Sequence, residues 1–203
     1  MKRLIILMVL LSVSINIHAQ QIGDIEIGLF GGASVSNIVS AQDLIESNLR
    51  FGVNGGVSAD YYFTEFVSLE LEAFYNQNGR VIDPMASNDS QISRTLTLHY
   101  ITVALLPNYH FGQDFNWYVM AGPYFSFLSG ANQGTAQVKE EFKGNDIGLT
   151  GGLGYEFPIS ANDNTSLFIE VVHQLGLSNI VKDNVNEDIR NTRTSLNLGI
   201  TFL

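Results

Sequence analysis

The sequence contains no cysteine, few basic residues and, beyond its N-terminal segment, no long apolar run. The absence of cysteine excludes disulfides, a lipid-modified cysteine anchor and thiolate metal ligands. Lys and Arg number 10 against 20 Asp and Glu, which gives a formal net charge of −10. We therefore expect no nucleic-acid partner, because proteins that bind nucleic acid present basic surfaces.

The N-terminal segment has the layout of a secretory signal peptide. Lys2 and Arg3 precede a short apolar run, and Ala19 stands at a suitable cleavage position. A retained membrane anchor is the alternative, but the apolar run is shorter than the ~20 residues that span a bilayer. We predict a signal peptide over residues 1–19 and one mature domain over residues 20–203.

Apolar and polar residues alternate along most of the mature chain. Leu69 and Leu71, for example, alternate with Glu70 and Glu72. This period of two is typical of strands with one apolar and one polar face, and no helical repeat of useful length follows residue 20. We expect eight strands, near residues 25–35, 51–61, 67–76, 96–111, 117–128, 147–157, 167–177 and 194–203.

Eight such strands predict an all-β fold, an eight-stranded antiparallel up-and-down transmembrane β-barrel. The connections have the lengths that this fold requires. Short links follow the second, fourth and sixth strands, and longer polar links follow the odd-numbered strands. Outer-membrane barrels have short turns on the periplasmic side and long loops outside. Both chain termini are therefore expected to face the periplasm.

The fourth strand is ambiguous. Leu96, Leu98 and Tyr100 alternate in one phase, whereas Ile101 and Val103 continue in the other. A β-bulge or a late strand start would each explain such a slip of phase.

The apolar faces must point either to lipid, as in a membrane barrel, or inward, as in a soluble lipocalin-like barrel. Two features favour lipid. Small residues share the polar face with carboxylates, as in Gly152, Gly154 and Glu156, which suits a narrow wet lumen. Aromatic residues also gather near strand ends, as in the interfacial girdles of outer-membrane barrels. These residues are Tyr61, Tyr75, Tyr109, Trp117, Tyr155, Phe157 and Phe202. We predict an integral protein of the cell outer membrane, with lipid and the barrel-assembly machinery as partners.

Six carboxylates share the face that we assign to the lumen: Glu26, Asp60, Glu70, Glu72, Glu156 and Glu170. Buried carboxylates need hydrogen-bond partners or counter-charges, so a structural network is the first interpretation of this cluster. The alternative is a narrow channel that prefers cations, because acidic linings concentrate them.

Enzymatic chemistry has little support in the sequence. The mature chain has three histidines. His99 and His110 are expected near opposite ends of the same strand, and His173 falls on the opposite strand face from Glu170. A lipid-modifying enzyme needs a base beside a hydroxyl and a carboxylate that orients the base. We therefore predict no catalytic residues, no cofactor and no metal site, and keep a lipid-modifying enzyme as an alternative.

Several segments resemble the PorT-like outer-membrane β-barrel family. The resemblance is carried by residues 99–111, by Ala121-Gly122-Pro123 within 117–124, by 146–157 and by 174–180, although Ala104 replaces the usual proline of the first segment. It covers essentially the whole mature chain and implies the barrel fold and the membrane. The resemblance also raises an accessory part in a protein-secretion apparatus as one role.

Large inward side chains are expected to block the lumen, and general diffusion is therefore not the expected activity. These side chains are Phe30, Tyr118, Tyr124 and Phe168. Our preferred hypothesis is a structural or interaction role in the cell envelope, in which the long polar loops or the periplasmic rim contact an envelope partner. The identity of that partner is left open.

Overall fold

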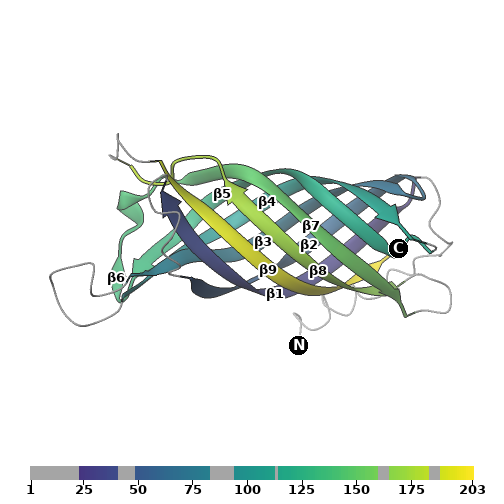
Figure 1. Cartoon of the computed structure of the whole chain (residues 1–203), viewed down its shortest axis with the longest axis horizontal. Helices are drawn as coiled ribbons and strands as arrows, with labels where there is room; N and C mark the ends of the chain where they lie inside the picture. Colours follow the sequence, from purple (N-terminus) through teal and green to yellow (C-terminus); the bar gives the residue numbers. More distant parts are fainter. Residues whose placement is uncertain (1–22, 41–48, 83–93, 113, 160–164, 183–187) are drawn as a thin grey trace, which may run out of the picture.

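The computed structural model describes residues 23–40, 49–82, 94–112, 114–159, 165–182 and 188–203, so the predicted signal peptide over 1–19 lies outside the described residues. The described chain is almost entirely strand (Figure 1). The strands are β1 (Ile25–Ser40), β2 (Arg50–Thr64), β3 (Val67–Ile82), β4 (Arg94–Phe111), β5 (Trp117–Gln133), β6 (Ala136–Gln137), β7 (Asn145–Pro158), β8 (Thr165–Gly176) and β9 (Ile189–Phe202). Within these residues, no helix has the length and apolar character to cross a bilayer.

Eight of these strands form one closed antiparallel sheet. The hydrogen-bonded order is β4-β3-β2-β1-β9-β8-β7-β5, and pairing of β4 with β5 closes the circle. Strand β6 is a two-residue hairpin arm that pairs only with the end of β5. With β6 left aside, neighbouring strands in the barrel also follow each other in the sequence. The exception is the pairing of β1 with β9, which joins the first strand to the last. The predicted eight-stranded antiparallel barrel is confirmed.

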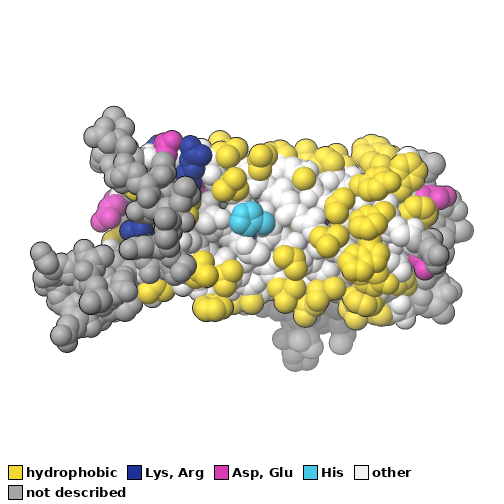
Figure 2. Space-filling view, viewed as in Figure 1, with side chains coloured by type: hydrophobic (Ala, Val, Ile, Leu, Met, Phe, Trp, Pro, Cys, Tyr) yellow, Lys and Arg dark blue, Asp and Glu magenta, His cyan; other side chains and the backbone are white. Residues whose placement is uncertain are grey.

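The alternation of the sequence becomes an alternation of burial. On β3, Leu71 is 51% exposed whereas its neighbours Glu70 and Glu72 are 7% and 5% exposed. The same pattern holds on the other long strands, so aliphatic and aromatic side chains cover the outside of the barrel (Figure 2). This arrangement is the inverse of a soluble barrel and suits contact with lipid acyl chains.

The two ends of the barrel differ. The turn end carries the short β2–β3, β4–β5 and β7–β8 connections, and the loop end carries the longer connections. The predicted strand bounds agree with the structure within three residues at the turn end, but several are too short at the loop end, where β1 reaches Ser40, β3 reaches Ile82 and β9 begins at Ile189. The ladder of backbone hydrogen bonds continues there through polar residues, beyond the apolar band that the alternation marks.

The predicted slip of phase in the fourth strand is wrong. Strand β4 pairs with β3 without interruption from Arg94 to Tyr109. The register shift lies on the neighbouring strand β5, where Ser129 is the extra residue between Leu128 and Gly130. At the loop end of β4, Leu96 and Leu98 point inward and are buried, whereas Ile101 farther along the strand points outward, so the apolar face changes sides without a break in the strand.

Leu98 belongs to an apolar cluster that fills the loop end of the barrel, which we call the mouth cluster. Its buried members are Ile38, Leu96, Leu98, Tyr100, Leu128, Ala131, Phe142 and Ile180. Phe142 and Ile180 come from two loops that are joined by an antiparallel bridge from Phe142 to Val181 and by a 2.7 Å bond from the Lys143 amide to the Ile180 carbonyl. The loops therefore pack their own apolar side chains into the barrel opening.

Candidate functional site

The structure places all six predicted lumen carboxylates inside the barrel. Their side chains are between 3% and 9% exposed. Pairing of β1 with β2 sets Glu26 opposite Asp60, and pairing of β2 with β3 sets Asp60 opposite Glu70. Strand register thus gathers residues from separate parts of the sequence into one acidic cluster.

Side-chain amides and a tyrosine hydroxyl donate hydrogen bonds to three carboxylates on the β1–β4 side of the cluster, Glu26, Asp60 and Glu70. The Tyr62 hydroxyl donates to Glu26 Oε2 at 2.9 Å. Asn108 Nδ2 lies 3.0 Å from Asp60 Oδ1 and 3.1 Å from Glu70 Oε2, so one amide group bridges two acids. Such bonds compensate for the hydration that a buried carboxylate loses.

Glu170, on β8, accepts hydrogen bonds from side chains of β5 and β9. Tyr118 donates its hydroxyl to Glu170 Oε2 at 3.0 Å, and Asn197 Nδ2 donates to Oε1 at 2.7 Å. The Asn197 side-chain oxygen in turn accepts a 2.7 Å bond from Asn54 Nδ2. This chain of bonds follows the inner wall of the barrel and ties β5, β8, β9 and β2 together.

Arg193 is a buried cation of the same interior. It is 2% exposed, its Nε donates to Gln174 Oε1 at 2.9 Å, and its guanidinium lies 5.4 Å above the Phe74 ring. Glu72 and Glu170 are its acidic neighbours. Arg193 therefore partly balances a strongly acidic interior and also packs against an aromatic face.

Serine, histidine and aspartate meet near the turn end, an arrangement that the sequence reasoning missed. The Ser68 hydroxyl donates to Asp60 Oδ1 at 3.0 Å and lies 3.3 Å from His110 Nε2. A hydrolytic triad needs the serine to donate to the imidazole and the carboxylate to hold the other ring nitrogen. Here the carboxylate binds the hydroxyl directly, and the rings of Tyr62 and Tyr118 pack on both sides of His110. The three side chains therefore lack the hydrogen-bond order of a hydrolytic triad.

The other two histidines lie on the outside of the barrel. His99 Nδ1 is 2.6 Å from the Tyr75 hydroxyl, and its Nε2 is 3.2 Å from Asn132. His173 is exposed on β8, while Glu170 of the same strand is buried, as the strand alternation predicts. The three histidines are therefore not brought together.

A second polar layer lies beneath the mouth cluster and was not predicted either. Asp146 accepts hydrogen bonds from Ser178 at 2.7 Å, from Asn191 at 2.9 Å and from Tyr124 at 3.1 Å. Asn191 also donates to the Tyr100 hydroxyl at 3.2 Å. Asp146 thus links the loop-end strands to the buried tyrosines.

Little empty space remains within the acidic cluster. A cavity of about 20 Å³, bordered by Asp60, Glu70, Asn108 and Glu156, has room for about one water molecule. In the part of the chain that the structure describes, no group of three or more His, Asp and Glu side chains has an arrangement that could hold a metal ion. The acidic cluster is therefore a closely packed polar part of the interior.

The predicted interfacial aromatics occupy two places on the outer surface. Six lie at the turn end, where neighbouring rings contact each other, as Trp117 does with Tyr155 at 4.8 Å and Tyr155 with Phe157 at 4.6 Å between centroids. The six are Tyr61, Tyr109, Trp117, Tyr155, Phe157 and Phe202. Tyr75 is apart from them, midway along β3 and stacked on His99.

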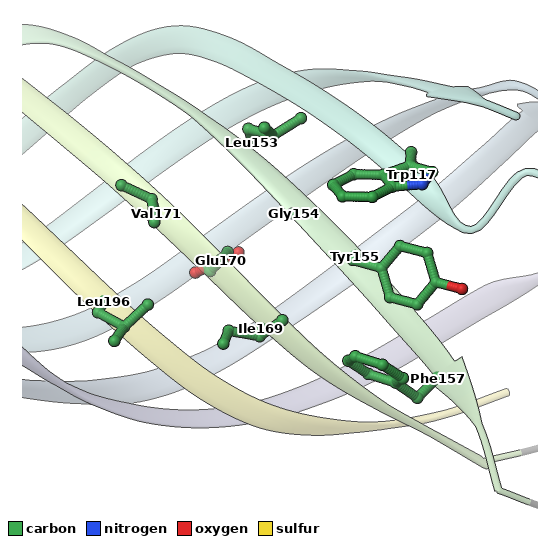
Figure 3. Close-up of a pocket in the computed structure, with 9 residues that line it drawn as sticks. All are labelled: Trp117, Leu153, Gly154, Tyr155, Phe157, Ile169, Glu170, Val171 and Leu196. Carbon is green, nitrogen blue, oxygen red and sulfur yellow. The ribbon is translucent and has the colours of Figure 1, made fainter.

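A hollow of about 580 Å³ lies on the outer wall beside these rings (Figure 3). Leu153, Ile169 and Leu196 project from three adjacent strands around it, and Gly154 forms part of its floor. The carboxylate of Glu170 lies behind the wall, on the lumen side (Figure 3). The hollow is apolar and open to the side, so an acyl chain of the bilayer fits it.

Replacement of Glu156 by glutamine is expected to stabilise the barrel by about 1 kcal/mol. The acidic neighbours of Glu156 are Glu26, Glu70 and Glu170, and among the described residues no basic side chain offsets their repulsion. Glu170→Gln should have the opposite effect, because an amide nitrogen would face one of its two donors. Urea unfolding in lipid vesicles measures both. A lower midpoint for Glu156→Gln would contradict this account.

Comparison with known proteins agrees with this architecture. A family model described as outer membrane protein beta-barrel domain matches residues 18–182. Comparison with curated protein sequences gave no match. Among solved structures, neisserial surface protein A is 15% identical with a TM-score of 0.51, over 87% of this chain and 96% of that one. OprG from Pseudomonas aeruginosa is 16% identical with a TM-score of 0.54, over 92% of this chain and 98% of that one. At these identities the likeness concerns the fold.

Proposed function

This chain belongs to the outer membrane protein beta-barrel domain family, and from that premise we propose that it is a closed barrel with a structural or interaction role in the cell envelope. It is a small outer-membrane β-barrel whose polar groups are turned inward and whose apolar side chains face lipid. A barrel that passes no solute acts through its outer wall, its rims and its loops.

The filled interior is the observation that carries this proposal. Phe74, Tyr118 and Met120 pack together in the middle of the lumen beside the acidic cluster. The bond from Asn191 to Tyr100 joins β9 and β4, which are four strands apart in either direction, and so crosses it, and the mouth cluster fills the loop end. Three successive layers of side chains thus occupy the axis. Eight-stranded barrels have an interior that side chains just fill.

The filled interior supports this role over a cation-preferring channel. Four of the six acidic residues that suggested a channel accept hydrogen bonds from Tyr62, Asn108, Tyr118 or Asn197; they are Glu26, Asp60, Glu70 and Glu170. A permeant cation needs exchangeable oxygen ligands along a continuous path. The arrangement of Ser68, in turn, supports a non-catalytic role, because its hydroxyl is bound to Asp60 and is 1% exposed.

Export by the predicted signal peptide, with the turn end in the periplasm, completes this proposal. The short connections at that end and the longer ones at the other support this orientation. The finer role implied by the resemblance to PorT-like barrels, an accessory part in protein secretion, stays a prediction. The loop end, where two loops are held by the mouth cluster, is the surface that we expect an envelope partner to contact.

Planar-bilayer recording tests the closed barrel. We expect the purified protein to insert without stepwise ion conductance, and we expect Phe142→Ala to remain equally silent. This variant opens the mouth cluster but leaves the two deeper layers in place. Conductance steps with cation selectivity that disappear in a Glu70→Gln, Glu72→Gln double variant would favour the channel instead.

A further inference from the structure

His173 is an ionisable side chain in the apolar outer wall of the barrel. His173 projects outward from β8 between Val171 and Leu175, which are 51% and 45% exposed. On the wall formed by β7, β8, β9 and β1, histidine lies midway along the barrel, whereas described acidic and basic side chains lie at its ends (Figure 2). Polar side chains on a lipid-facing surface are costly, and an ionisable one there marks a functional contact.

One of the two ring nitrogens of His173 has a hydrogen-bond partner. His173 Nδ1 is 2.9 Å from the hydroxyl of Thr194, its cross-strand neighbour on β9. No residue that the structure describes forms a hydrogen bond with Nε2. Acyl chains offer neither a donor nor an acceptor, so lipid leaves this nitrogen unsatisfied.

The surface around His173 permits close approach of another protein. Gly151, its cross-strand neighbour on β7, has no side chain, and Ala121 lies beside Gly151 on β5. Exposed leucines and valines surround the row of small residues formed by Ala121 and Gly151, among them Leu149 and Leu153. Small residues that let backbones approach, with a polar group among them, are typical of contacts between proteins within membranes.

We propose that this wall binds a second copy of the same chain, with the two His173 side chains facing each other across a two-fold axis. Such an axis brings identical residues together. A pair of neutral imidazoles can form one bond, in which Nε2–H of one copy donates to Nε2 of the other. The two histidines then need opposite tautomers at Nδ1.

Thr194 can hydrogen-bond to either tautomer of His173, and a second copy suits this surface for that reason. A threonine hydroxyl donates to an unprotonated Nδ1 and accepts from a protonated one. Each copy therefore keeps its bond to Thr194 whichever tautomer it adopts. The contact satisfies both Nε2 atoms and buries the leucines of both walls. It does not depend on whether the lumen is closed.

Single-cysteine cross-linking tests the contact, because the chain has no cysteine of its own. The full-length protein would be placed in phospholipid vesicles at several protein-to-lipid ratios and then oxidised. We expect Leu175→Cys, beside His173, to give a disulfide-linked dimer. Leu71→Cys is the matched control, since Leu71 is equally exposed on β3, four strands from β8 in either direction. We expect it to stay monomeric. Equal cross-linking of the two, or a monomer at every ratio, would overturn the proposal.

Substitution of the histidine tests its role. His173→Leu should weaken the dimer by about tenfold, because the bond between the copies is lost. His173→Asn should retain more of the dimer, since an amide carries both a donor and an acceptor. His99→Leu, on the outer wall of β4, should leave the dimer unchanged. Heat-modifiable gel mobility verifies that each barrel is folded. An unweakened dimer in His173→Leu, or cross-linking to a different protein alone, would refute the proposed contact.

Discussion

Replacement of Arg193 by methionine is expected to lower the free energy of unfolding by about 3 kcal/mol, because it removes a buried cation from an acidic interior. The guanidinium is 2% exposed and has Glu72 and Glu170 as acidic neighbours. Its bond to Gln174 and its contact with the Phe74 ring would be lost as well. Methionine preserves much of the volume, so the charge dominates the effect.

Urea unfolding in vesicles, followed by the fluorescence of the single tryptophan, Trp117, measures this loss. Arg190→Met is the matched control on the same strand. Arg190 lies at the surface, 3.0 Å from Asp188, and such an exposed ion pair contributes about 0.5 kcal/mol. Adding Glu72→Gln to Arg193→Met should recover part of the stability. Equal effects of the two arginine substitutions would show that Arg193 does not balance the carboxylates.

Gly56→Val is expected to cost about 3 kcal/mol, even though valine favours strands more than glycine does. Gly56 faces the lumen opposite Phe74 on β3 and Phe30 on β1. The rings of Phe30 and Phe74 pack 5.8 Å apart, and a Cβ at position 56 would overlap Phe74 and the Ala73 carbonyl. Phe74 would have to move, and the contact with Arg193 would move with it.

Gly31→Val is the control, and its effect should have the opposite sign. Gly31 lies opposite Gly55 on the outside of β1, and a Cβ there would meet only the Asn54 carbonyl at 3.8 Å. Valine should therefore stabilise the strand slightly, by a few tenths of a kcal/mol. The same unfolding measurement applies. If Gly56→Val also stabilised the barrel, the lumen would have more room than the structure shows.

The sequence predicted the barrel well because local alternation follows the environment of each strand face. Leu69 and Leu71 face outward, and Glu70 and Glu72 face inward, as the alternation indicated. The bounds were poorer at the loop end because strands there continue through polar residues. The two apolar phases of β4 suggested a break because the sequence did not reveal that Leu98 would enter an apolar cluster inside the barrel.

Side-chain contacts between different strands were beyond the sequence. Ser68 and His110 are separated by 42 residues, and Asn54 and Asn197 by 143. Nothing local indicates that they should meet. Likewise, only the structure shows that Thr194 is the partner of His173.

By itself, therefore, the sequence determined which side chains face lipid and which face the lumen, since a strand of period two separates its faces without reference to any other strand. Closure of the sheet and the register of each pair decided the rest. They brought the six carboxylates together inside the barrel, seated Phe142 in the mouth and placed His173 beside Thr194. These outcomes depend on pairings between distant strands, which only the tertiary structure specifies.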